Sequence, residues 1–499
     1  MPEALHSRLP LTDSFEAGYL EFNGVLPLEI AGERLRVAVA GEPAPEVLDD
    51  LELSFGLPLE LVSVTAAELS DAIRRTFGAA DTVVELIRDL GETLDAGGES
   101  EAPVADARDL INQPPVIRFV NLLIREAHDA RASDVHLESL REGLRLRFRV
   151  DGVLLDVPSP PKGLQAAVVS RIKLLAELDI AERRRPQDGR IRVRLEEREL
   201  DLRVSSVPTL YGESVVLRLL DRGGRPVRLD ELGMGPELLT RFRALADRPH
   251  GVVLATGPTG SGKTTTLYAA LALRRVSAEK VITVEDPVEY HLEGVTQVPV
   301  NVKAGMTFGS ALRSILRQDP DVLMVGEMRD VETVAIALQA AMTGHLVFST
   351  LHTNDAASAV TRLLDLHAEP YLIAATLEGV LAQRLVRRIC PDCRERYRPD
   401  PQAVALLAGQ PVGTITLERG RGCPTCRNTG YHGRTGIFEL LTFSDDGDEL
   451  RRAVGSGADR TRLRELARTA GMTTLREDGW HKVQAGITTV EEVLRVVQD

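Results

Sequence analysis

The second half of the chain alternates short apolar runs with segments in which apolar residues recur at helical spacing. The runs are rich in β-branched residues and cover 252–255, 281–284, 322–325 and 346–348. Strands of a parallel sheet are buried on both faces and are joined by crossover helices, so they appear in a sequence as continuous apolar runs. From Leu229 onward the sequence therefore predicts an α/β domain with a mainly parallel sheet.

Residues 111–220 show a different pattern, in which one helical segment is followed by alternating polar and apolar positions. The apolar positions of the helical segment are Val116, Phe119, Val120, Leu123 and Ala127. The alternating runs 144–150 and 153–155 are separated by Asp151-Gly152, a pair that favours a two-residue hairpin turn. Because further alternating runs extend to residue 219, the pattern predicts an α+β domain over this whole segment.

The N-terminal region is predicted to form a separate small α+β module over residues 1–90. It mixes alternating segments such as 34–39 with a helical pattern over 66–77. Periodicity is lost over 91–110, where Gly, Ser and acidic residues gather, so this segment is predicted to be a flexible linker. Residues 221–228, rich in Gly and Arg, predict a second linker.

Length and composition are typical of a soluble protein with several domains, since the chain has 499 residues of which 43% are hydrophobic. No stretch reaches the roughly 18 consecutive apolar residues that a membrane span requires. The N-terminus begins Met1-Pro2-Glu3 and shows no positive segment followed by an apolar one, so no signal peptide is expected. We therefore expect a cytoplasmic protein.

Charge is distributed unevenly along the chain, whose formal net charge is −14. Residues 1–110 hold 7 Arg and no Lys against 23 Asp and Glu, whereas the remainder is close to neutral. An acidic or neutral surface argues against a broad phosphate footprint, so no nucleic-acid partner is expected. The acidity of the N-terminal module favours either a docking role or solubility.

The most specific motif in the chain is a phosphate-binding loop, G-x-x-x-x-G-K-[ST]. It consists of Gly257, Pro258, Thr259, Gly260, Ser261, Gly262, Lys263 and Thr264. The apolar run before it predicts a buried strand, and residues 265–271 after it predict a helix, which is the context that the motif requires. Backbone N–H groups, the helix N-terminus and the Lys263 ammonium would bind nucleotide phosphates, and the Thr264 hydroxyl would bind Mg²⁺.

Acidic and histidine residues follow or flank three of the predicted strands. Glu285 follows the run 281–284, and Glu327 lies just beyond 322–325. Because ligands of open α/β sheets bind at the carboxyl ends of the strands, both carboxylates could face the loop. His345 precedes the run 346–348 and His352 follows it, where a histidine could sense the γ-phosphate or simply cap the strand.

All four cysteines occur in two C-x-x-C pairs separated by 29 residues. They are Cys390, Cys393, Cys423 and Cys426. Disulfides would not persist in a cytoplasmic protein, so this spacing predicts a tetrahedral Zn²⁺ site, with redox pairs or metal-free pairs as the alternatives. Four thiolates leave no open position for water, so the site would be structural. The insert covers about residues 388–430 of the predicted domain 229–499.

Several of these motifs together resemble the type II/IV secretion ATPase family, the motors of type II secretion and type IV pilus assembly. The segments 285–289, 317–330 and 343–354 resemble the Asp box, Walker B motif and His box of that family. Upstream, 184–191 and 203–218 also match it. The resemblance extends from about residue 111 to the C-terminus.

The resemblance implies a RecA-like P-loop ATPase core preceded by two α+β domains, binding ATP with Mg²⁺ and carrying the Zn²⁺ insert. It implies a type II secretion ATPase that assembles as a homo-hexamer and moves an inner-membrane platform to extend a pseudopilus and drive protein export. The acidic module would dock a bitopic inner-membrane protein. The ATPase would then be peripheral at the inner membrane, with indirect membrane contact.

The resemblance also implies roles for individual residues. In the family, the acid at the position of Glu327 lies on the Mg²⁺ side, which leaves Glu285 to orient or deprotonate the attacking water, although the two assignments could be exchanged. Arg203 and Arg218 match arginines that reach toward the nucleotide from the preceding domain. Positive charge there would offset the charge that develops on the γ-phosphate.

Three alternatives remain. One is a type IV pilus assembly ATPase, which would share every catalytic residue named above. A pilus-retraction ATPase is disfavoured, because that branch of the family generally lacks the four-cysteine insert. A nucleic-acid translocase on the same core is disfavoured by the acidic balance and the Zn²⁺ insert. A nucleotide sensor that only scaffolds assembly would lack catalysis.

The C-terminal segment 440–499 is predicted to be helical. Gly486 is expected to end one helix, because glycine tolerates the left-handed conformation found after helix C-termini. Thr488 and Glu491 are expected to form the capping box of the last helix.

Overall fold

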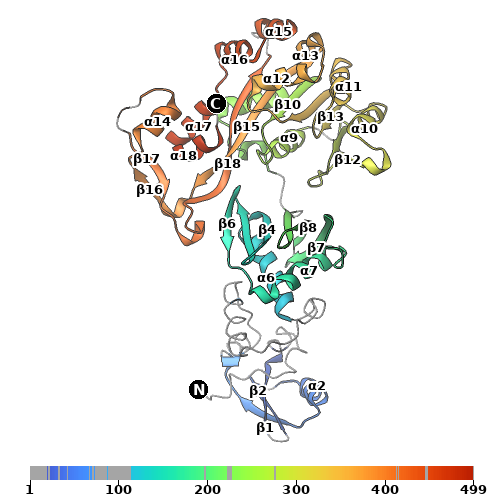
Figure 1. The fold of residues 1–499 in the computed structure, drawn as a ribbon, viewed down its shortest axis with the longest axis vertical. Helices are drawn as coiled ribbons and strands as arrows, with labels where there is room; N and C mark the ends of the chain where they lie inside the picture. Colours follow the sequence, from blue (N-terminus) through green and yellow to red (C-terminus); the bar gives the residue numbers. More distant parts are fainter. Residues whose placement is uncertain are drawn as a thin grey trace. The chain divides into compact units, whose positions relative to one another are not determined.

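A computed structural model describes residues 114–497, with gaps at 196–197, 222–226, 275–276, 412, 414 and 444–447, and part of the region before them. In that region it describes residues 20, 23–31, 34–41, 43–66, 68–69, 72 and 87. The chain divides near residue 220 into two compact units, whose elements Figure 1 labels. Across these residues, no helix is both long enough and apolar enough to cross a membrane.

The N-terminal module contains a three-stranded sheet, with a helix between its second and third strands. The strands are β1 (Val25–Ala31), β2 (Arg34–Val39) and β3 (Leu59–Ser63), and the helix between β2 and β3 is α2 (Pro45–Phe55). β1 pairs antiparallel and β3 parallel with β2. The alternating segment 34–39 is therefore a strand, as predicted. The predicted helix over 66–77 lies only partly within the described residues, and the predicted linker at 91–110 lies outside them.

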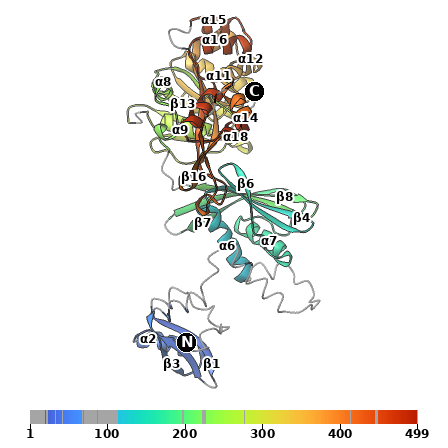
Figure 2. The ribbon, with the colours of Figure 1, turned by 90° about the vertical axis from the view of Figure 1, so that its left-hand side faces the viewer.

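The second domain is a six-stranded sheet in the order β6-β5-β4-β9-β8-β7. Its strands are β4 (Ala132–Leu140), β5 (Gly143–Val150), β6 (Val153–Val157), β7 (Gln187–Leu195), β8 (Arg198–Thr209) and β9 (Gly212–Asp221). Helices α6 (Pro114–Asp129) and α7 (Gln165–Leu175) lie on the same side of this sheet (Figure 2).

Local signals determine much of this second domain. Asp151 and Gly152 form the turn between β5 and β6, both with positive φ, which confirms the predicted hairpin. The apolar residues predicted for the first helix are all buried in α6, because their spacing places them on one face. The predicted linker over 221–228 falls largely outside the described residues.

The C-terminal domain contains a seven-stranded sheet in the order β12-β11-β13-β14-β10-β15-β18. Its strands are β10 (Gly251–Thr256), β11 (Val281–Glu285), β12 (Thr296–Pro299), β13 (Val322–Val325), β14 (Leu346–Leu351), β15 (Leu377–Ile389) and β18 (Tyr431–Thr442). All neighbouring strands pair in parallel except β15 and β18, which form a long antiparallel pair. The predicted, mainly parallel sheet is thus confirmed, and β12, β15 and β18 extend it.

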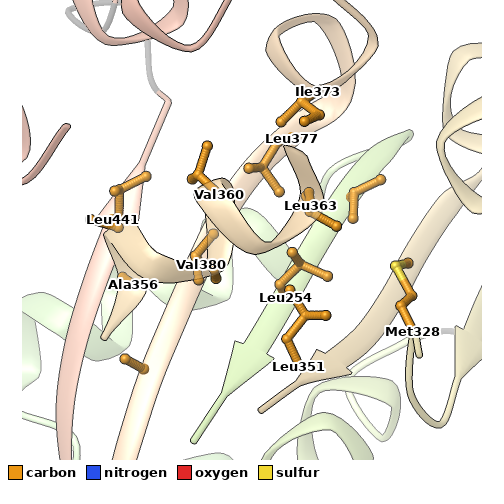
Figure 3. Packing of buried hydrophobic residues seen from close by; sticks show 14 of the residues in the cluster. Leu254, Met328, Leu351, Ala356, Val360, Leu363, Ile373, Leu377, Val380 and Leu441 are labelled. Atoms are coloured by element: carbon orange, nitrogen blue, oxygen red, sulfur yellow. The ribbon is translucent and has the colours of Figure 1, made fainter. Parts of the chain in front are cut away.

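Helices cover both faces of this sheet. They are α8 (Pro236–Ala246), α9 (Lys263–Leu271), α10 (Phe308–Ile315), α11 (Val331–Met342), α12 (Ala356–Asp365) and α13 (Pro370–Thr376). In β10, Val252 and Leu254 pack on the side of α11 and α12, whereas Val253 and Ala255 pack on the side of α8 and α9. Figure 3 shows α12 lying across the sheet, with Val360 and Leu363 above Leu254. A strand buried on both faces explains why β10 is apolar at successive positions.

The cysteine insert and the C-terminal helices follow β15. The insert contains β16 (Arg394–Tyr397), α14 (Pro401–Ala408) and β17 (Leu417–Gly420), and the last helices are α15 (Asp448–Gly455), α16 (Arg460–Thr469), α17 (Leu475–Gln484) and α18 (Val490–Val496). Gly486 follows α17 with φ +66°, as predicted.

The predicted capping box of the last helix is wrong by one residue. Thr489, not Thr488, is the N-cap of α18, and its hydroxyl accepts a hydrogen bond from the Glu492 N–H. The Thr488 hydroxyl instead donates to the Arg387 carbonyl on β15, 2.8 Å away. A tertiary hydrogen bond therefore uses the side chain that the local pattern assigned to the cap.

Candidate functional site

The phosphate loop connects β10 to α9 at the carboxyl end of the parallel sheet. Gly257, Gly260 and Gly262 all have positive φ, at +151°, +77° and +87°. A Cβ atom at Gly257 would lie only 2.6 Å from the backbone oxygen of Gln383, so a larger residue would not fit there. The structure thus forms the strand, loop and helix that the motif requires, an arrangement in which backbone N–H groups can line an anion-binding concavity.

Lys263 is buried at the start of α9, while Thr264 beside it is half-buried. The Lys263 Nζ donates to the carbonyl oxygens of Gly257, at 2.7 Å, and Pro258, at 3.1 Å. Burial lowers the pKa of Lys263 to about 8, although Glu327 acts in the opposite direction. The amine is therefore still mostly charged at neutral pH, but it loses its proton at a much lower pH than an ordinary lysine.

The lowered pKa of Lys263 predicts that nucleotide affinity depends on pH. Phosphates bind the charged amine, and a pKa of about 8 means that the free protein loses this charge as the pH rises through that value. Affinity for a fluorescent ADP analogue, measured by titration, should therefore fall about tenfold between pH 7 and pH 9. The residual affinity of a Lys263→Ala variant should show no such fall. Equal wild-type affinities at the two pH values would contradict the prediction.

Glu327 and His352 come together at the ends of the neighbouring strands β13 and β14. Glu327 is 9% exposed and its carboxylate lies 2.5 Å from the Arg329 Nε and 3.4 Å from the His352 Nε2. The Thr350 hydroxyl donates to the Gly326 carbonyl, at 2.7 Å, which fixes the end of β13 against β14. These contacts place a carboxylate and an imidazole beside each other near Lys263.

The pKa of His352 is lowered chiefly by burial and also by the positive charge of Lys263, while Glu327 raises it. The direction of the shift favours neutral imidazole at neutral pH. A neutral ring has both a donor and an acceptor nitrogen, which suits hydrogen bonding to phosphate or to an ordered water.

Glu285 ends β11, next to β13, and is 2% exposed. Tyr268 of α9 donates its hydroxyl to the Glu285 carboxylate, as does Thr283 of the same strand. The Gln297 amide donates to the same group at 3.2 Å. Burial and the Glu285 carboxylate raise the pKa of Tyr268 far above its usual range, so the phenol remains a donor. Glu285 is thus held in a buried network beneath the phosphate-loop helix.

Sequence reasoning did not identify Tyr268, Thr283 and Gln297 as site residues. Tyr268 occupies an apolar position of the predicted helix, and Thr283 lies inside a predicted buried strand, so both fit a simple core pattern. A buried carboxylate needs hydrogen-bond donors, so the expectation that Glu285 ends a buried strand could have prompted a search for polar side chains near it.

The structure does not bring His345 to the phosphate loop. Leu346, which follows it, pairs with Gly251 at the start of β10, whereas Leu351 pairs with Thr256 next to the loop. His345 therefore lies at the amino ends of the strands, opposite to the loop and about 20 Å away along a six-residue strand. Its Nδ1 is 2.9 Å from the Ala340 carbonyl, a contact that closes the turn after α11.

Arg203 and Arg218 lie on the neighbouring strands β8 and β9 of the second domain. The Arg218 Nε donates to the carboxylate of the buried Asp134, at 2.8 Å, and Arg149 lies 3.8 Å from the other oxygen of that carboxylate. The Arg218 side chain is nevertheless 58% exposed. Within this domain, Asp134 thus orients an arginine whose side chain remains accessible to solvent.

The four cysteines meet at one point, with sulfur atoms within 4.8 Å of one another. The Cys390–Cys423 and Cys393–Cys426 sulfur pairs are 3.8 Å apart, and the Cys423–Cys426 pair is 3.7 Å apart. Zn–S bonds of about 2.3 Å in a tetrahedron require sulfur separations of roughly 3.8 Å. The residues therefore fit a four-thiolate Zn²⁺ site, whose role would be to hold the insert together.

Backbone donors support a thiolate at this site. The N–H groups of Cys423 and Gly430 lie 3.2 and 3.3 Å from the Cys426 sulfur. Burial opposes ionisation, but these N–H groups, together with hydrogen bonds from the Cys423 and Cys393 thiols, outweigh it and lower the pKa of Cys426 to about 7. The thiolate is the form that binds metal, so a lowered pKa favours binding.

Comparison with known proteins identifies two matching families. The family described as Type II/IV secretion system protein matches residues 109–495, and the MshEN domain matches residues 2–83. The pilus retraction motor PilT, solved with bound ADP, is 26% identical with a TM-score of 0.52, covering 76% of this chain and 96% of that one. The likeness to this solved structure thus extends over about three quarters of the chain.

Named relatives match over most of their length. The Type II secretion system protein E of Xanthomonas campestris pv. campestris is 48% identical, covering 98% of this chain and 86% of that protein. The Type II secretion system ATPase E of Vibrio cholerae is 45% identical, covering 88% of each. The Type IV pilus assembly ATPase PilB of Myxococcus xanthus is 42% identical, covering 94% and 83%. This chain belongs to the type II/IV secretion system protein family.

Proposed function

We propose that this chain is the ATPase of a type II secretion system, which hydrolyses ATP to drive pseudopilus assembly and protein export. The observation that carries the proposal is the phosphate loop with Lys263 buried in it, beside the Glu327–His352 pair at the ends of adjacent strands. The relatives named for type II secretion support the assignment to that system.

We propose separate roles for the two carboxylates. Thr264 and Glu327 would hold Mg²⁺ beside the ATP phosphates, because Glu327 is close enough to Lys263 to influence its charge. Glu285 would orient or deprotonate the attacking water, once its hydrogen bonds with Tyr268 and Thr283 have rearranged. His352 would contact the γ-phosphate or its water, and Arg203 and Arg218 would offset negative charge in the transition state.

The family also suggests which partners this protein has. We propose a homo-hexamer that acts on inner-membrane platform proteins, with residues 1–90 docking a bitopic membrane protein. The strongly acidic composition of residues 1–110 supports a protein partner for this module rather than nucleic acid. The protein would then be cytoplasmic and peripheral at the inner membrane, with indirect membrane contact.

The second candidate is a type IV pilus assembly ATPase, which the Myxococcus xanthus relative supports. Both candidates require the same catalytic residues, so only a cellular readout separates them. The scaffold and translocase alternatives differ from both in biochemistry, since a scaffold would not hydrolyse ATP and a translocase would respond to DNA.

The test uses a deletion strain complemented with wild-type protein or with Lys263→Ala. We expect lost secretion with intact pili in the deletion strain, rescue by the wild type, and no rescue by the variant. Normal secretion with Lys263→Ala would favour the scaffold, lost pili would favour pilus assembly, and DNA-stimulated turnover of the purified protein would favour a translocase. Immunoblots for equal protein levels provide the control.

A further inference from the structure

Two consecutive residues of β15, Gln383 and Arg384, lie against the phosphate loop. β15 runs parallel to β10, with Ala382 paired to Thr256, so the next residues of β15 are level with the loop that follows β10. Figure 1 shows β15 and β18 as the long strand pair of this sheet. The sequence motifs of the site contain neither residue, because both come more than 110 positions after the loop.

Gln383 holds the loop through its side chain. It is 2% exposed, and its Nε2 donates to the Ser261 carbonyl over 2.6 Å. The same nitrogen would lie 3.1 Å from a Cβ atom at Gly262, so the loop and the amide are in close contact. This hydrogen bond fixes the Ser261 peptide group, and therefore the direction in which the next N–H groups point.

Arg384 connects the loop to the segment after His352. It is 8% exposed, and its Nη2 donates to both the backbone oxygen and the Oδ1 of Asn354, at 3.0 and 3.1 Å. Its Nη1 would lie 3.1 Å from a Cβ atom at Gly257. The guanidinium thus packs against the first glycine of the loop.

The charge of Arg384 has no direct partner. In the part of the chain that the structure describes, no carboxylate lies within 4.0 Å of its guanidinium, which donates to the carbonyl oxygens of Gln383 and Asn354 and to the Asn354 amide oxygen. Burial lowers the pKa of Arg384, while the more distant Asp355 and Glu439 raise it. A buried cation without an ion-pair partner is costly, and a bound polyphosphate close by would relieve that cost.

We propose that Gln383 and Arg384 are positioning residues of the nucleotide site: Gln383 holds the phosphate loop in its binding conformation, and Arg384 ties the loop to Asn354 and adds a second buried positive charge behind it. The inference rests on the proposed function, because it concerns the same nucleotide site.

Substitutions of Gln383 and Arg384 are expected to affect nucleotide binding in different ways. Gln383→Leu keeps the volume but removes the donor, so the loop loses its anchor and nucleotide affinity should fall. Arg384→Gln removes both the charge and the two hydrogen bonds from Nη2 to Asn354, whereas Arg384→Lys keeps the charge. If the charge of Arg384 contributes, nucleotide affinity should depend on the salt concentration. Arg384→Gln should lose part of this dependence, and Arg384→Lys should retain it.

The experiment titrates the full-length protein with a fluorescent ADP analogue and Mg²⁺ at several salt concentrations. We expect Arg384→Gln and Gln383→Leu to weaken binding about tenfold and Arg384→Lys by about threefold or less. Their kcat values at saturating ATP should change less than their KM values. Arg388→Gln is the matched control, because Arg388 lies exposed on the same strand and the substitution removes the same charge.

Folding is checked independently by the melting temperature and zinc content of each variant, and Gln383→Leu keeps the test decisive if Arg384→Gln is unstable. The inference is overturned if folded Gln383→Leu and Arg384→Gln bind like the wild type or weaken only as much as Arg388→Gln. Failure of the proposed function looks different, since wild-type protein would then bind no nucleotide or Lys263→Ala would bind it normally.

Discussion

Replacing Glu285 by Gln is expected to leave nucleotide affinity nearly unchanged and to reduce ATP turnover by about 100-fold or more. The amide keeps the size of the side chain and its hydrogen bond from Tyr268, so the site should still form. It cannot accept a proton from water, and removing a general base costs about 10²- to 10⁴-fold. Phosphate release would measure turnover, and titration with a fluorescent ADP analogue would measure binding.

Two further variants make this result interpretable. Glu293→Gln is the matched control, because Glu293 is exposed on the segment between β11 and β12 and its change should leave turnover intact. Glu327→Gln should instead raise the Mg²⁺ concentration needed for half-maximal turnover, as expected for a group on the metal side. Normal turnover of Glu285→Gln would transfer the water-handling role to Glu327.

Replacing Cys390 by Ser is expected to remove the bound metal and to lower the melting temperature by about 10 °C, a loss of several kcal/mol. The sulfur separations of 3.7 and 3.8 Å match a zinc tetrahedron, and one missing thiolate breaks it. Elemental analysis of the wild type should find one Zn²⁺ per chain. Differential scanning calorimetry would follow the stability.

The cysteine insert is connected to the rest of the domain, so losing the metal should destabilise more than the insert itself. β15 leads directly into Cys390, and its Arg387 donates two side-chain hydrogen bonds to the buried Glu492 of α18, each at 3.0 Å. Thr425→Ser, inside the second C-x-x-C pair at an exposed position, is the control that should retain metal. A Cys390→Ser protein that still carries one Zn²⁺ would refute the four-thiolate site.

The site shows where sequence reasoning succeeds and where it fails. The phosphate loop and the paired cysteines were predictable because their chemistry depends on residues at short, fixed spacing. His345 was expected near the nucleotide because it lies close to His352 in sequence. The six-residue strand β14 lies between them, so the two histidines are at opposite ends of that strand. Ligands of such sheets bind at the carboxyl ends of the strands, where His352 lies.

Four features could be predicted from the amino-acid sequence alone: the alternation of strands and helices, the loop around Lys263, the strand-end position of Glu285 and the cysteine pairs. Local propensity, apolar periodicity and motif spacing carry that information. The hydrogen bond from Tyr268 to Glu285, and the contacts of Gln383 and Arg384 with the loop, became visible only in the folded chain. The reason is physical: these contacts arise from the order and register of strands, which bring together residues distant in the chain, and no local pattern encodes them.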